Sequence, residues 1–438
     1  MRSALVRKVL EGLRSGTTWL LLGSLVAAMG AYLFQFITTR SLGEVRYAPI
    51  GALWTIQYLT VSIFLYSVET YVTRDSLRAE GGGSRSVPLI RIWASIAVVA
   101  GAVLVSTWWF RDQLFLGRGD LAAVAGCIVL AFGAFMIVRG RLAGSGRFKA
   151  YGLVTASESI VRFGLALSGA AIGAGTGVFA WVMPLGALTA ASLWPVLTRH
   201  RSAPNRQVVR ATSGGTARFL VVTTSANAGA QVLLAGGPLI LAFLHASPTD
   251  ISVFFVTVTA ARLPIVFVFG GILSRLLSTF VRLADSDQGR SLRQAAARIA
   301  AGTAAVALVG GAAAAVVGGP AIGLLFGHGF RPAWWVAAGA AMGVLLGTGS
   351  LVLNQIFVAT GSEARLPVVW MTALFGSALT VAVTDWSPLA RVIAGFIGGE
   401  AIALIGLAVA ALSRSDRWPW ITAPPEPIGL SPQTTDPL

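Results

Sequence analysis

The chain has 438 residues, of which 55% are hydrophobic and only 11% are charged. A soluble domain has about 25% charged residues, so this chain has too little polar surface to face water on every side. Its net charge of +16 would suggest a nucleic-acid partner in a soluble protein, but here it favours basic loops that face anionic membrane lipids, and no nucleic acid is expected.

The chain begins with a short amphipathic segment, residues 1–16. Leu5, Val9 and Leu13 recur there at helical spacing among basic residues. That pattern predicts a helix lying in the inner headgroup layer of a membrane.

Apolar segments long enough to cross a bilayer, about 20 residues each, then fill almost the whole chain. Those of the first half, the N-lobe at 17–197, are 17–39, 47–73, 89–110, 120–139, 151–173 and 178–197. Those of the second half, the C-lobe at 218–412, are 218–243, 251–282, 296–318, 333–358, 366–384 and 388–412. The sequence therefore predicts an all-α polytopic membrane protein with about twelve transmembrane helices.

A basic link at 198–217 joins the two halves. It carries Arg199, Arg201, Arg206 and Arg210 and no acid. Short loops rich in Lys and Arg stay on the cytoplasmic side of a membrane, so the link is expected in the cytoplasm. An even number of spans on each side then places both termini there, and the Pro-rich tail at 413–438 is expected to be disordered. The expected location is the bacterial cytoplasmic (inner) membrane.

Arg262 is the clearest ionisable residue inside a predicted span. Such a group costs roughly 2.5–3.5 kcal/mol to insert and usually faces a cavity or a partner. No acid lies within a helical turn of Arg262, and Thr259 is on the same helical face. Because a guanidinium matches two phosphate oxygens, we interpret the two residues as candidates to bind a diphosphate. The alternative is an ion pair with an acid on another helix, for which Glu400 in the last span is the favoured partner.

Arg162 lies in the fifth span, four residues after Glu158. That spacing and order favour an ion pair on one helix, so a structural pair is the preferred interpretation. The alternative is that both side chains line a cavity and separate when an anion or a proton arrives.

Glu69 ends a polar stripe of the second span that starts at Thr55. It lies near the predicted cytoplasmic end, so we expect its side chain to reach water. The alternative is a cation site. Glu69, Glu158 and Glu400 are the three acids that could couple transport to H⁺ or Na⁺.

Two further sets of polar residues are candidates. Asn227 and Gln231 share a face of the seventh span, where a wall facing a sugar and a hydrogen-bonded seam between helices fit equally well. Arg40 follows the first span; it could catch a phosphate at the outer surface, but a solvated loop is favoured.

Several chemistries have no support in the sequence. There is no G-x-x-x-x-G-K-[ST] phosphate loop. His200, His245 and His328 fall in separate loops, and Cys127 is the single cysteine, so neither a metal site nor a disulfide within the chain is expected. No soluble loop offers paired acids for sugar cleavage. We therefore expect no enzyme activity, no cofactor and no metal.

Leu324 to Gly361 reads LLFGHGFRPAWWVAAGAAMGVLLGTGSLVLNQIFVATG. This stretch resembles the segment from the end of the ninth span through the tenth span in the multidrug, oligosaccharidyl-lipid and polysaccharide (MOP) exporter superfamily. Val256 to Leu277, VTVTAARLPIVFVFGGILSRLL, resembles its eighth span. Ser41–Leu42–Gly43 and Gly146–Arg147–Phe148 fit its polysaccharide-biosynthesis, O-antigen-type flippase branch.

The resemblance implies two six-helix lobes around a central cavity that opens alternately to either side. For the flippase branch it implies movement of a polyprenyl-diphosphate-linked oligosaccharide from the inner to the outer leaflet, beside glycosyltransferases and a glycan polymerase. A cation-coupled drug antiporter of the same superfamily is the alternative. A third class is the major facilitator type, whose usual Gly-Asp-Arg signature follows the second span. This chain lacks that signature, because its loop there reads TRDSLRAEGGGSRSV.

Overall fold

The computed structural model describes residues 16–80, 89–193, 228–263, 280, 289–360 and 362–413, and the regular elements within these ranges are all helices. The predicted amphipathic segment up to residue 15, the basic link at 198–217 and the tail from residue 414 lie outside the described residues.

The first half of the described chain, residues 16–193, contains eight helical elements. Its elements are α2 (Gly16–Thr60), the π-helix η1 (Val61–Leu65), α3 (Tyr66–Glu80), α4 (Leu89–Trp109), α5 (Arg111–Phe115), α6 (Asp120–Gly144), α7 (Phe148–Ala171) and α8 (Thr176–Ser192). The first two predicted spans meet within α2 at Gly43, where φ is 71°. Glycine tolerates this positive φ because it has no Cβ, so the helix kinks there without strain.

The second half, residues 228–413, contains helices at 228–235 and 248–263. Its other elements are α11 (Gly237–Phe243), α13 (Gly289–Phe326), the 3₁₀ helix η2 (His328–Phe330), α14 (Trp334–Ala359), the 3₁₀ helix η3 (Glu363–Arg365), α15 (Leu366–Val383) and α16 (Pro388–Leu412). Within the described part of the chain, seven helical stretches are long and apolar enough to cross a membrane, and one of them, Thr18–Leu77, contains two predicted spans.

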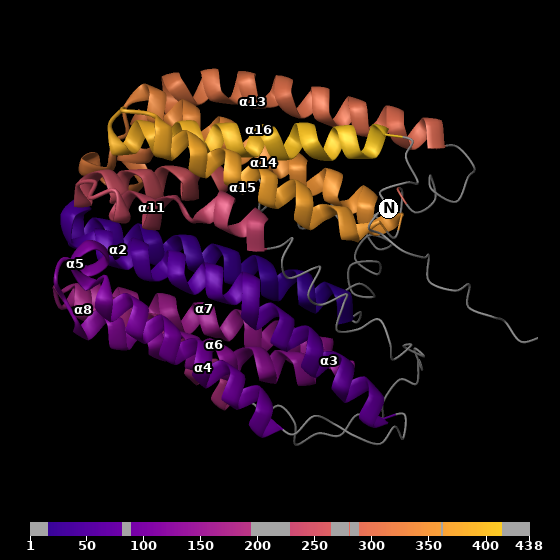
Figure 1. Cartoon of the computed structure of the whole chain (residues 1–438). Coiled ribbons are helices and arrows are strands. Elements are labelled where there is room, and N and C mark those ends of the chain that lie inside the picture. Colours follow the sequence, from indigo (N-terminus) through magenta and orange to yellow (C-terminus); the bar gives the residue numbers. More distant parts are fainter. Residues whose placement is uncertain are drawn as a thin grey trace, which may run out of the picture.

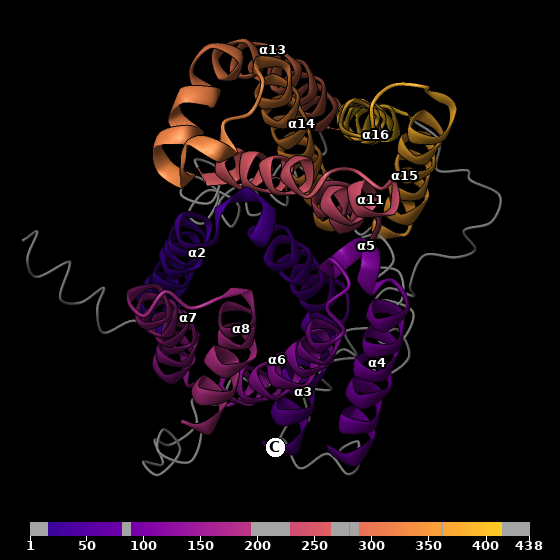
Figure 2. The ribbon, with the colours of Figure 1, turned by 90° about the vertical axis from the view of Figure 1, so that its left-hand side faces the viewer.

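Each half is a helical bundle of its own (Figure 1). In the first half α2 packs on α7, and α6 packs on α3, α4 and α8; in the second half α14 packs on α13 and α16, and α16 packs on α15. The halves meet where α2 contacts α11, α13 and η2, and where α5 contacts α11. Seen end-on, α11 lies between the helices of the first half and α15 and α16 (Figure 2).

Glycines set the distance between α2 and α7. A Cβ on Gly23 would lie 2.4 Å from the carbonyl oxygen of Gly152, and a Cβ on Gly30 would lie 2.7 Å from Cβ of Ser159. Small residues of this kind let the backbones of transmembrane helices approach closely. The first and fifth spans are therefore held against each other along two helical turns.

The halves are joined at the end of the bundle that holds Gly43, hereafter the Gly43 end. The ring of Tyr47 is fully buried, and its centre lies 5.6 Å from that of Phe330 and 6.0 Å from that of Phe255. Ser252 Oγ donates a hydrogen bond of 2.6 Å to the carbonyl oxygen of Glu44. Aromatic packing and backbone contacts thus connect the two halves at this end.

Candidate functional site

A cavity of about 280 Å³ lies between the two halves. Both arms of α2 form one wall, and the helices between residues 228 and 263 form the other. Most of the lining is apolar or aromatic, and its polar side chains are Tyr32, Gln35, Thr55, Tyr58, Thr259 and Arg262. A mostly apolar cavity with a few convergent polar groups is the usual form of a ligand site.

Arg262 lies on the helix described over residues 248–263 and lines this cavity. Its Nη2 donates a hydrogen bond to the carbonyl oxygen of Leu234, and its Cζ lies 5.7 Å from the centre of the Tyr58 ring. Its Nε has no hydrogen-bond partner among the described residues. No described carboxylate lies within the 4.0 Å that defines an ion pair. The positive charge therefore faces the cavity without a direct counter-ion there.

Glu400 on α16 lies close to this site but does not bond to Arg262. Its side chain is fully buried, and neither carboxyl oxygen has a hydrogen-bond partner within the described chain. A Cβ on Gly347 would lie 2.8 Å from Cδ of Glu400 and 2.6 Å from Cδ1 of Leu234, so the two side chains meet over that glycine. The direct bridge that we considered from the sequence is not formed.

Thr259 also lines the cavity, as its position on the Arg262 face predicts. Its carbonyl oxygen accepts a hydrogen bond of 3.3 Å from Tyr32 Oη on α2, a contact that crosses between the halves. Gln231 is half-buried in the helix at 228–235 and is not part of the cavity lining, and Asn227 lies outside the described residues.

Glu158 and Arg162 form the ion pair expected from their spacing on α7. Both side chains are about 5% exposed. Cζ of Arg162 lies 5.0 Å from the centre of the Trp54 ring, and Ser159 Oγ donates a hydrogen bond of 2.9 Å to Glu158 Oε2. Trp54 lines the cavity whereas Arg162 does not. The pair therefore lies inside the first half, behind the indole.

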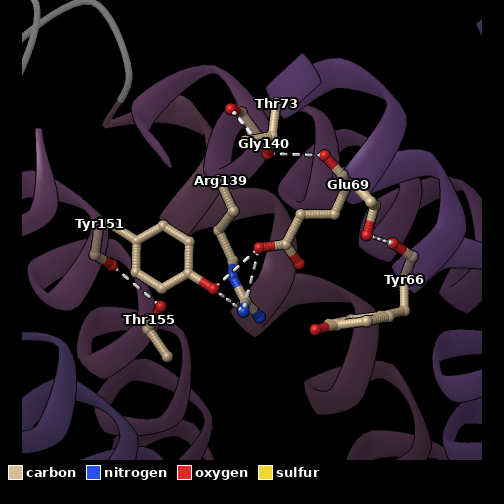
Figure 3. A network of polar contacts seen from close by, with 8 residues as sticks. Tyr66, Glu69, Thr73, Arg139, Gly140, Tyr151 and Thr155 are labelled. Atoms are coloured by element: carbon tan, nitrogen blue, oxygen red, sulfur yellow. Dashed lines mark hydrogen bonds and ion pairs between the residues drawn. The ribbon is translucent and has the colours of Figure 1, made fainter. Parts of the chain in front are cut away.

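Glu69 does not reach water, so that interpretation of the sequence is wrong. The residue is 6% exposed, and its Oε1 lies 3.3 Å from Arg139 Nη2. Tyr151 Oη donates a hydrogen bond of 2.8 Å to the same oxygen and accepts one from Arg139 (Figure 3). Arg139, the last residue of the predicted span 120–139, lies inside α6 because that helix continues to Gly144. The three side chains connect α3, α6 and α7.

Arg40 is not in a solvated loop either. It lies within α2 at the Gly43 end, and its Nε donates a hydrogen bond of 3.1 Å to the carbonyl oxygen of Leu325, while its Nη2 donates to that of Leu324. These carbonyls belong to the last turn of α13, where a cation is favoured by the helix dipole. Arg40 thus ties the first half to the second.

Several residues that line the cavity were not predicted from the sequence. They are Tyr32, Gln35, Trp54 and Tyr58, all on α2. Gln35 was a usable signal, because an amide inside an apolar span needs a polar neighbour. The aromatic residues gave no such signal, since tyrosine and tryptophan are common in transmembrane helices of every kind.

No family model matches the chain. Its curated relatives include the uncharacterized protein Rv1510 of Mycobacterium tuberculosis, which is 25% identical over 353 residues covering 76% of each chain. Another is the uncharacterized protein Rv3630 of the same species, 25% identical over 410 residues that cover 89% of this chain and 90% of that one. These relatives carry no functional description.

Solved structures give a clearer result. The inward-facing conformation of a multidrug resistance MATE family transporter of the MOP superfamily superposes with a TM-score of 0.63 at 13% identity, covering 89% of this chain and 97% of the other. The chain has a MATE-type transporter fold. The outward-facing conformation of such a transporter gives a TM-score of 0.53 at 14% identity, covering 92% and 96% of the two chains. A MOP superfamily transporter from Pyrococcus furiosus, described as having a binding pocket of reverse polarity, gives 0.54 at 14% identity, also covering 92% and 96%.

The MATE-type fold confirms the predicted fold class, an all-helical polytopic membrane protein. At 13–14% identity, the likeness extends to the fold and not to the transported molecule.

Proposed function

We propose that this protein is a transporter that moves a polyprenyl-diphosphate-linked oligosaccharide from the inner to the outer leaflet of a bacterial cytoplasmic membrane. The observation that carries the proposal is Arg262, which lines the cavity between the halves without a direct ion pair to any described residue. A cation kept in an apolar bundle is costly, and a diphosphate would offset that cost because its oxygens match the guanidinium. The MATE-type fold supports alternating access between the two membrane faces.

The rest of the cavity wall suits the other parts of such a ligand. The aromatic side chains of Trp54 and Tyr58 line the cavity and would contact the sugars, and the hydroxyl of Thr55 and the amide of Gln35 would be hydrogen-bond partners. The lipid tail would remain in the bilayer between the two halves. Glycosyltransferases would supply this substrate from the cytoplasm, and a polymerase would use it at the outer surface.

The experiment is glycan export in cells whose surface polysaccharide depends on this protein. The Arg262→Gln variant should block export and leave the lipid-linked precursor in the inner leaflet, at a normal level of membrane protein. Arg391→Gln is the matched control: Arg391 Nε also donates to a backbone carbonyl, that of Val381 at 2.7 Å, but Arg391 does not line the cavity. Full export by the Arg262→Gln variant would overturn the proposal.

One observation favours a second candidate, a cation-coupled small-molecule antiporter. The carboxyl oxygens of Glu400 are buried and have no hydrogen-bond partner in the described part of the chain, so the group is free to take up a proton or a small cation. Dye efflux from vesicles, driven by an H⁺ or Na⁺ gradient and lost in the Glu400→Gln variant, would support this function over lipid flipping.

A further inference from the structure

The carbonyl oxygen that Arg262 binds has no partner within its own helix. In an α-helix the carbonyl of each residue accepts a hydrogen bond from the N–H four residues later. For Leu234 that residue is Pro238, which has no N–H. The helix is broken at this point: residues 228–235 end before Gly236, and α11 starts at Gly237 with Pro238 in its first turn. Leu239 N and Ile240 N both donate to the carbonyl oxygen of Gly236, at 3.0 and 3.1 Å, so neither serves Leu234.

Arg262 supplies the missing donor from the neighbouring helix. Its Nη2 donates to the Leu234 oxygen, and Leu234, Pro238 and Arg262 all line the cavity between the halves. A partly buried carbonyl without a donor is destabilising, so this bond holds the broken helix and the guanidinium together. The same guanidinium is the group that an anion in the cavity would use.

We infer that Pro238 is a positioning residue for an anion site. Because Pro238 has no N–H, the carbonyl oxygen of Leu234 takes its hydrogen bond from Arg262. That carbonyl therefore competes with a bound diphosphate for the Arg262 guanidinium. This inference rests on the proposed function, because it takes the cavity ligand to be a diphosphate. When the anion takes the guanidinium, the Leu234 carbonyl loses its donor, and the break before α11 loosens. α11 contacts α2, α5 and α16. Ligand binding therefore changes the packing of α11 at the junction of the two halves.

The first test needs no ligand. Thermal unfolding of the full-length protein in detergent is compared for wild type, Pro238→Ala, Arg262→Gln and the double variant. An alanine restores the N–H that serves Leu234, so Arg262→Gln should lower the Tm of the wild-type chain and have much less effect in a chain that already carries Pro238→Ala. Equal losses in both backgrounds would overturn the inference. Pro238→Ser restores the same N–H and replaces the alanine variant if that protein folds poorly.

The second test measures binding of inorganic pyrophosphate to the same purified proteins by calorimetry. Pro238→Ala frees Arg262 from the carbonyl and should tighten binding by about tenfold, the scale of one hydrogen bond to a charged group. Pro320→Ala is the matched control, because Pro320 also lies inside a helix of the second half, α13, but away from the cavity. It should leave the affinity unchanged.

The outcomes separate the two proposals. If Pro238→Ala binds pyrophosphate no more tightly than wild type while Arg262→Gln abolishes binding, the competition is refuted and the anion site stands. If Arg262→Gln binds as wild type does, the anion site itself is refuted, whatever the coupling seen in the unfolding experiment.

Discussion

Nη2 of Arg139 on α6 lies 3.3 Å from Oε1 of Glu69 on α3, inside the first half of the molecule. The arginine side chain is 17% exposed and the glutamate side chain 8%, so water screens the pair only weakly. Tyr151 on α7 donates to the same carboxylate oxygen. The network therefore links α3, α6 and α7 (Figure 3).

Glu69→Gln should destabilise the protein strongly. The substitution leaves Arg139 buried without its counter-ion, a loss of about 3–5 kcal/mol for a buried pair. Tyr151→Phe is the control, because it removes two hydrogen bonds but keeps the ion pair, and should cost less, about 1–3 kcal/mol. Thermal unfolding in detergent measures both, and a Glu69→Gln variant as stable as wild type would show that the carboxylate contributes nothing.

The close packing of α2 on α7 gives a second prediction. A Cβ on Gly152 would lie 2.2 Å from the carbonyl oxygen of Trp19, a backbone atom that cannot rotate away. Gly152→Ala should therefore force the helices apart and cost about 1–3 kcal/mol. Gly164 lies on the same helix, and a Cβ added there would meet no atom within 4 Å, so Gly164→Ala should be neutral or slightly stabilising, because alanine has the better helix propensity. Equal unfolding temperatures for the two variants would contradict this account.

The Glu158–Arg162 pair should stabilise the folded protein and take no direct part in transport. Arg162→Met alone leaves a buried carboxylate without its partner and should lower the level of folded protein. The double variant Glu158→Gln, Arg162→Met removes both charges and should recover much of that level. Glycan export per folded molecule should then be close to wild type, because neither side chain lines the cavity. Loss of export in a well-folded double variant would assign the pair a direct part in transport.

The sequence predicts the positions of the helices well, because hydropathy is a local property. It also predicts the Glu158–Arg162 pair, since both partners lie one turn apart on one helix. It fails for Glu69 and Arg40, whose partners lie on other helices and depend on how those helices pack. The extension of α6 to Gly144 is a further reason, because it carries Arg139 inside the bundle. For Arg262, its position inside an apolar span with no nearby acid indicates a cation within the membrane. Its bond to Leu234, however, depends on the helix break that Pro238 introduces.

Arg40 gives a prediction about opening of the Gly43 end. Its guanidinium holds two carbonyls of the last turn of α13, so Arg40→Gln should weaken the contact between the halves. The side chain is exposed, and an exposed hydrogen bond of this kind is worth about 1 kcal/mol, which is about a fivefold change in an opening equilibrium.

Ser252 offers a reporter for that opening, because it is fully buried and bonds to the Glu44 carbonyl across the halves. With Cys127 replaced by serine, a Ser252→Cys thiol should react with a membrane-impermeant maleimide only when this end opens. Arg40→Gln should raise the labelling rate about fivefold. Arg118→Gln is the control, because Arg118 pairs with Asp120 within the first half and should not change the rate. If Arg40→Gln labels no faster than the parent Ser252→Cys protein, the halves are held at this end by the aromatic contacts of Tyr47 instead.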